Sequence, residues 1–141
     1  MNKKKTYLVI VPFFPSKGFF IGSYIFDQVK ELKSQTSLSI EVVKVISLFS
    51  NEKDYIFKGI KVRVFKIIDF PWFILPGIFN TLNKLRFHYF LKNKDIENID
   101  FVHAHIAYPS SYLIEDFDCK RIVQHHGLDV LQLLNGRISF I

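Results

Sequence analysis

The chain has 141 residues, of which 49% are apolar, 23% charged and 16% aromatic, a balance that excludes a disordered or fibrous protein and is typical of one globular domain. The net charge is +6, and the single cysteine, Cys119, excludes an intrachain disulfide, which favours a reducing, cytoplasmic compartment. The longest apolar stretch, from Phe70 to Phe79, contains two prolines. It is far shorter than the ~20 residues of a membrane-spanning helix, so we predict no membrane span.

The first apolar element runs from Tyr7 to Val11 and ends at Pro12. Lysines precede it, as in a signal peptide, but the proline and the lack of a small-residue cleavage site favour a strand buried on both faces. A long loop with Gly18 and Gly22 follows. From Ser23 to Lys33 the apolar residues keep a helical spacing, which predicts an amphipathic helix.

Runs of β-branched residues predict two further strands, at 40–46 and 60–67, joined by a polar connection that we expect to be exposed. A helix is predicted in the second half of segment 70–94. Its apolar residues lie on or near one helical face, which we expect to pack on the sheet, namely Ile78, Phe79, Leu82, Leu85, Tyr89 and Phe90. A short helix at 110–117, opened by Pro109, lies between a fourth strand at 100–105 and a fifth at 121–125.

This alternation of strands and helices predicts an α/β fold. We expect residues 1–141 to form a single domain with a doubly wound, mainly parallel, Rossmann-like sheet. Ligands of such sheets bind beyond the carboxyl ends of the strands, where the strand order reverses. In the commonest order, 3-2-1-4-5, the loops after the first and fourth strands flank that crevice.

Four of the five histidines fall at this predicted edge. His103 and His105 end the fourth strand, whereas His125 and His126 end the fifth. Two residues apart on a strand, His103 and His105 share one face. They can act as proton carriers near neutral pH, as zinc ligands together with His125 or His126, or as ordinary structural residues.

Two glycine-containing turns border the same edge. Gly22 precedes the first predicted helix, where backbone N–H groups can approach a phosphate or a sugar hydroxyl; the alternative is a loop glycine needed only for its dihedral angles. His126, Gly127 and Asp129 form a turn after the fifth strand, in which Asp129 can equally cap a following helix.

Three segments resemble the family 4 glycosyltransferases. The first is G-S-Y-I-F-D-Q-V-K-E-L (22–32), similar to the family's G-x-F-V-x-x-Q-x-x-x-L except that Tyr24 replaces Phe. The second is D-F-V-H-A-H (100–105), and the third is Q-H-H-G-L-D-V (124–130), which looks like T-x-H-G-x-D. They occur in the family's order, and each lies at a predicted strand–loop junction.

The resemblance implies the N-terminal, acceptor-side domain of a two-domain GT-B enzyme. Such an enzyme transfers a sugar with retention of configuration, without metal or other cofactor, from a nucleotide-sugar donor to a polysaccharide or lipid-linked acceptor. It implies a catalytic role for His105, beside the transferred sugar, and substrate-binding roles for Gly22, His103, His126, Gly127 and Asp129. The family's C-terminal domain, with its E-x7-E nucleotide-binding motif, has no counterpart in the chain, so we expect the chain alone to be inactive or nearly so.

Segment 71–94 has a second interpretation besides a helix packed on the sheet. It combines six aromatic residues and four cations with no acid, a composition that suits an anionic membrane surface. Peripheral binding to the inner face of the cytoplasmic membrane is therefore an alternative. The cations are scattered and form no recognition motif, so we expect no nucleic-acid binding.

Two other functions stay open from the sequence. One is a metal-dependent hydrolase that uses His103, His105 and either His125 or His126. The other is a non-catalytic remnant that binds a glycan or a separately encoded C-terminal half.

Overall fold

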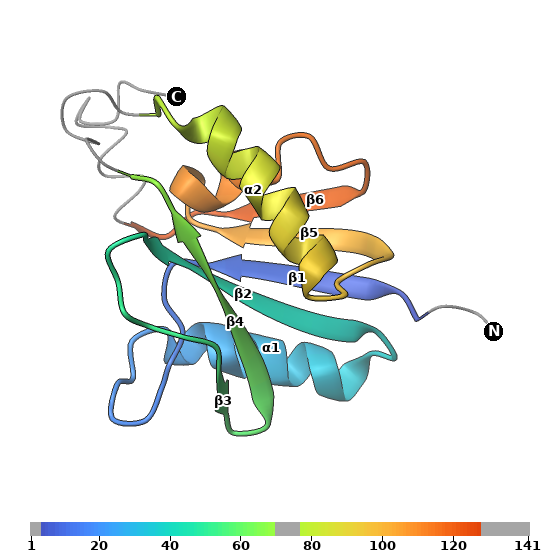
Figure 1. Ribbon diagram of the computed structural model, residues 1–141. Helices are drawn as coiled ribbons and strands as arrows, with labels where there is room; N and C mark the ends of the chain where they lie inside the picture. The colour runs from blue at the N-terminus through green and yellow to red at the C-terminus, as the bar shows by residue number, and fades with distance from the viewer. Residues whose placement is uncertain (1–3, 70–76, 128–141) are drawn as a thin grey trace.

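The computed structural model describes residues 4–69 and 77–127, which form a six-stranded sheet with helices on both faces (Figure 1). The elements in chain order are β1 (Thr6–Val11), α1 (Ser23–Gln35), β2 (Ser39–Ser47), β3 (Tyr55–Phe57), β4 (Ile60–Ile67), α2 (Asn80–Asn93), β5 (Ile99–His105), a short helical turn (Ala107–Ser111) and β6 (Lys120–Gln124). The strand order is β3-β4-β2-β1-β5-β6. Only the β3–β4 pair within this sheet is antiparallel. The fold is therefore mixed α/β with a mostly parallel sheet, consistent with the Rossmann-like class.

The five predicted strands and their order are confirmed, but the prediction missed β3. It lies inside the polar connection between β2 and β4, and it pairs with β4 through a tight turn at Lys58 and Gly59. Both turn residues have positive φ, 44° and 79°, as a two-residue hairpin turn of type I′ requires. The strand has only three residues, Tyr55–Phe57, which is shorter than the run of about four to eight residues that marks a strand in a sequence.

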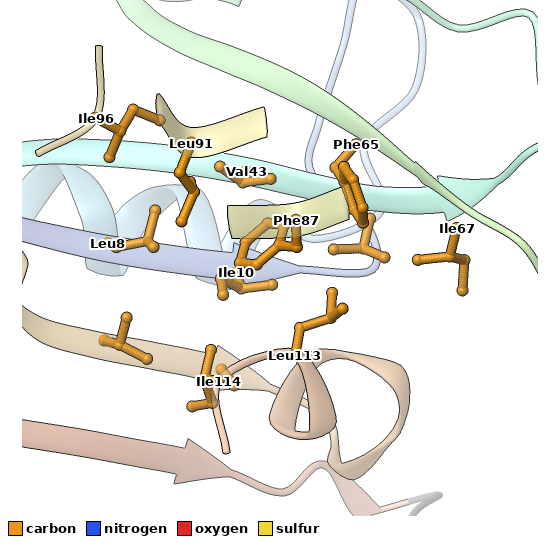
Figure 2. Close-up of a cluster of buried hydrophobic side chains, with 13 residues drawn as sticks. Leu8, Ile10, Val43, Phe65, Ile67, Phe87, Leu91, Ile96, Leu113 and Ile114 are labelled. Carbon is orange, nitrogen blue, oxygen red and sulfur yellow. The ribbon is translucent and has the colours of Figure 1, made fainter. Parts of the chain in front are cut away.

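Successive side chains along each strand point to opposite faces of the sheet. The structure therefore has two separate hydrophobic cores, one on each face. On one face, Leu8 and Ile10 of β1 pack with Phe87 and Leu91 of α2 (Figure 2). On the other face, residues of β1 such as Val9 pack against α1. Because β1 is buried on both faces, its sequence is an almost continuous apolar run.

The predicted buried face of α2 is wrong. Leu82, Leu85 and Tyr89 are 44%, 65% and 68% exposed, and Ile78, just before the helix, is 57% exposed. Phe79 and Phe90 are half-buried. The buried residues of α2 are instead Asn83, Phe87 and Leu91. The helix carries apolar side chains on two opposite sides, so helical spacing finds two candidate faces and cannot choose between them.

The chain after β5 also differs from the prediction. A helical turn forms at Ala107–Ser111 and continues through residues 112–113, so it begins earlier and ends earlier than the predicted helix at 110–117. Tyr108 within it has extended backbone angles. Among the described helices, none is both long and apolar enough to cross a bilayer.

Candidate functional site

Gly22 is the N-cap residue of α1 and has a left-handed backbone with φ +87°. A Cβ atom at this position would lie 2.9 Å from the carbonyl oxygen of Phe13. Both the dihedral angle and the close approach therefore require glycine. Two residues later, the ring of Tyr24 meets the imidazole of His126 edge-on, with 5.1 Å between ring centroids. The start of α1 thus lies beside the predicted histidine edge.

Three of the four edge histidines form a stack, which we call the histidine stack: His103, His105 and His126. The rings of His103 and His105 lie 4.3 Å apart, which confirms that they share one face of β5. The rings of His105 and His126 are nearly parallel, at 8°, and His105 Nδ1 is 3.1 Å from His126 Nε2. At the other end, the Tyr7 hydroxyl lies 3.2 Å from His103 Nδ1. A continuous row of rings therefore joins β1, β5 and the segment after β6.

The inner members of the histidine stack are removed from solvent. His103 is 4% exposed, His105 is fully buried, and His126 is half-buried above them. Burial lowers the pKa of His103, and burial together with the neighbouring histidines lowers the pKa of His105 to about 3. Both imidazoles are therefore neutral at physiological pH, when each can donate one hydrogen bond and accept another.

Within the described residues, the buried Nε2 atom of His105 has no hydrogen-bond partner, whereas the imidazole of His103 also interacts with the side chain of Gln124. Buried polar atoms in native proteins are almost always paired, because an unpaired one costs about 1–3 kcal/mol. Most buried imidazoles have their ring nitrogens paired with protein groups or ordered water. The unpaired nitrogen of His105 is the reason to consider the histidine stack a candidate functional site.

The backbone after β5 is strained next to the stack. Ile106 has φ +77°, an outlier for a β-branched residue that costs about 1–3 kcal/mol. Its N–H donates to the Gln124 carbonyl oxygen at 2.9 Å, which holds the end of β5 against β6. The Gln124 side chain in turn accepts from Gln28 of α1 at 3.4 Å. These contacts fix the three elements that carry the site.

The structure brings together most of the predicted site residues. His103, His105 and His126 meet directly, and Gly22 is joined to them through Tyr24. Gly127 follows the stack and is exposed, and a Cβ atom there would have no atom of residues 4–69 or 77–127 within 4 Å. Asp129 lies outside the described residues. His125 is exposed and is not part of the stack.

Sequence reasoning missed three contributors to the site: Tyr7, Tyr24 and Gln124. Tyr7 reaches His103 only because β1 and β5 are neighbours in register, with Val9 opposite His103. The tyrosine at 24 was visible as a departure from the family pattern, but its contact with His126 depends on where α1 lies over the sheet. No local sequence signal indicates either contact.

The histidine stack does not have the geometry of a metal site. Among residues 4–69 and 77–127, no group of three or more His, Cys, Asp or Glu side chains is placed to hold a metal ion. The hydrolase interpretation therefore has no geometric support from these residues.

Comparison of the chain with protein-family models and with curated proteins found no match.

Proposed function

We propose that the chain is the acceptor-side, N-terminal half of a retaining, metal-independent glycosyltransferase of family 4, with a doubly wound sheet as in the GT-B fold. The observation that carries the proposal is the meeting of three segments that are far apart in sequence. Segments 22–32, 100–105 and 124–130 resemble the family's motifs, and Tyr24, His105 and His126 come from one segment each and lie in contact.

The chemistry of this edge suits a sugar or a phosphate. Neutral imidazoles both donate and accept hydrogen bonds, as hydroxyl groups require, and the N-terminus of α1 favours an anion. Tyr24 is 48% exposed and offers a ring face to a sugar. We propose that Gly22, His103, His126, Gly127 and Asp129 bind substrate.

The catalytic role proposed for His105 has a geometric condition. His105 is fully buried, and His126 stacks on it. Direct contact between His105 and the transferred sugar therefore requires His126 to move aside. Without that movement, His126 is the imidazole that meets substrate, and its hydrogen bond with His105 orients it.

The proposed donor is a nucleotide-sugar held mainly by a C-terminal domain, and the proposed acceptor is a glycan or a lipid-linked glycan on the cytoplasmic side of the membrane. The chain alone is expected to bind acceptor without transferring sugar. Detectable sugar transfer by the purified chain would contradict the proposal that a second domain must supply the donor.

Side-chain NMR of the histidines tests the site. We expect an acceptor glycan to shift the ring resonances of His126, and His126→Ala to abolish binding. His125→Ala, an exposed neighbour outside the stack, is the matched control and should bind normally. Stoichiometric zinc that is lost in His105→Ala would instead favour the hydrolase. Glycan binding without transfer, even when a family C-terminal domain is supplied, would favour a non-catalytic binding domain.

A further inference from the structure

The outward side of α2 carries an apolar stripe. Leu82, Leu85 and Tyr89 are separated by three and four residues, so they lie on one side of the helix, and Ile78 extends the row beyond its first turn. All four side chains are 44–68% exposed. The opposite side of α2 already packs on the sheet through Phe87 and Leu91 (Figures 1 and 2). We call the four exposed residues the outer stripe.

A groove of about 390 Å³ lies beside the outer stripe, between β4 and α2. Tyr89 lines the groove and also belongs to the stripe, so the two surfaces are continuous. Three cations, Lys66, Arg86 and Lys94, line the groove, and none of its lining residues is acidic. The groove therefore joins aromatic and basic groups at the edge of an apolar surface.

The charge of this surface is largely uncompensated. Lys66 donates to the Ser50 carbonyl and Arg86 to the Asn83 side-chain oxygen, both uncharged acceptors. Lys94 is the exception, because it forms an ion pair with Asp54 at 2.7 Å. The sequence of α2 contains no acidic residue, although its Lys84 and His88 pair with Glu115 and Asp116 on a neighbouring segment. Lys92 is exposed in the last turn of α2.

We propose that the outer stripe and the adjoining groove dock the protein on the surface of an anionic lipid bilayer. The stripe lies at the boundary between headgroups and acyl chains, Lys92 beside it meets the lipid phosphates, and Lys66 and Arg86 make the adjoining groove basic. A second copy of the chain is a poorer occupant, because two such surfaces would bring like charges together. This proposal is independent of the glycosyltransferase proposal, since no residue of the histidine stack takes part.

Flotation of the whole chain with vesicles tests the proposal. We expect the chain to float with vesicles of phosphatidylglycerol and phosphatidylcholine in equal parts, to stay behind with pure phosphatidylcholine, and to be released by salt. Lys92→Gln should weaken binding about fivefold, the effect of removing one cation near an anionic surface. Leu85→Gln should weaken it about tenfold by removing apolar burial.

Matched controls are available away from this surface. Ile56→Gln on β3 replaces an apolar residue that is 72% exposed, and Lys30→Gln on α1 replaces an exposed lysine on the other side of the sheet; both should bind like the parent chain. Three results would overturn the proposal: no flotation with anionic vesicles, equal flotation with uncharged vesicles, or equal losses in the controls. A dimer that dissociates in Leu85→Gln would assign the outer stripe to a second copy instead.

Discussion

The side-chain amide of Asn83 in α2 forms two hydrogen bonds with the backbone of Ile68, just after β4. Asn83 Oδ1 accepts from the Ile68 N–H, and Asn83 Nδ2 donates to the Ile68 carbonyl, both at 2.9 Å. The asparagine thus satisfies both backbone groups of Ile68 where the β4 ladder ends. It also turns its own side of α2 toward the sheet, which leaves the outer stripe outside.

We therefore expect Asn83→Leu to destabilise the fold although it adds apolar volume to a buried position. Both backbone groups of Ile68 would lose their partners, at a cost of about 2–3 kcal/mol in the free energy of unfolding. Urea denaturation measures this difference. Asn93→Leu, at an exposed position of the same helix, should change stability by less than about 0.5 kcal/mol, and an equal loss in both variants would contradict the role of Asn83.

Gly22→Ala tests the start of α1. The substitution places a Cβ atom 2.9 Å from the Phe13 carbonyl oxygen and forces alanine to adopt φ +87°, so we expect a loss of about 2–4 kcal/mol. Gly18→Ala is the matched control, because Gly18 has a similar φ of +81° but open space around its Cβ position. Gly18→Ala should lower the free energy of unfolding by only about 1 kcal/mol, the cost of holding alanine at a positive φ. Equal losses in urea denaturation would show that the close approach at Gly22 is relaxed in solution.

The histidine stack should make stability depend on pH. Imidazole has a pKa of 6.5 in the unfolded chain, whereas burial and its neighbours lower the pKa of His105 to about 3 in the folded protein. Between these values the unfolded chain binds a proton that the folded chain does not, so stability falls as the pH falls. His105 alone contributes a slope of about 1.4 kcal/mol per pH unit over this window, and His103, whose pKa is also lowered, adds to it.

Denaturation at several pH values between 4 and 7 gives this slope. His105→Gln should reduce it, because the variant cannot take up that proton when it unfolds. Phe101→Leu, which alters packing beside Tyr7 without removing an imidazole, should lower stability equally at every pH. An unchanged slope in His105→Gln would show that His105 is accessible to protons in the folded state.

The strands were the most predictable part of the fold, for a physical reason. β1 is buried on both faces, so its sequence from Tyr7 to Val11 is continuously apolar whatever surrounds it. The orientation of α2 was not predictable, because both its sides are apolar. The side that faces the sheet is chosen by the Asn83–Ile68 hydrogen bonds and by the contact of Phe87 with Phe65, 4.9 Å between ring centroids, which depend on tertiary structure.

The location of the site was predictable from the sequence, but the packing of its side chains was not. The two-residue period of a strand puts His103 and His105 on one face, and the rule for parallel sheets puts them near the carboxyl edge. The full burial of His105 beneath His126 depends on how the chain turns after β6. The hydrogen bond from Tyr7 to the stack depends on the register between β1 and β5, which spacing along one chain segment does not encode.

Lys44 of β2 and Glu52, in the connection that follows β2, provide a last test. The Lys44 side chain is 8% exposed, and its ammonium group lies 2.7 Å and 2.9 Å from the two carboxylate oxygens of Glu52. Glu52→Gln leaves a nearly buried ammonium group without its counter-charge, so we expect a loss of about 3 kcal/mol. Lys44→Met removes that charge, keeps most of the apolar stem and leaves a glutamate that is 32% exposed, so its loss should be at most about 1 kcal/mol.

Urea denaturation of both variants, with Asp100→Asn as control, measures this asymmetry. Asp100 pairs with Lys5 at 3.5 Å, and the Lys5 side chain is 69% exposed, so the control should lose less than about 1 kcal/mol. We expect Glu52→Gln to lose more stability than Lys44→Met, because Glu52→Gln leaves the buried ammonium group of Lys44 charged and without its partner. A larger loss in Lys44→Met than in Glu52→Gln would mean that packing of the lysine stem outweighs the ion pair at this position.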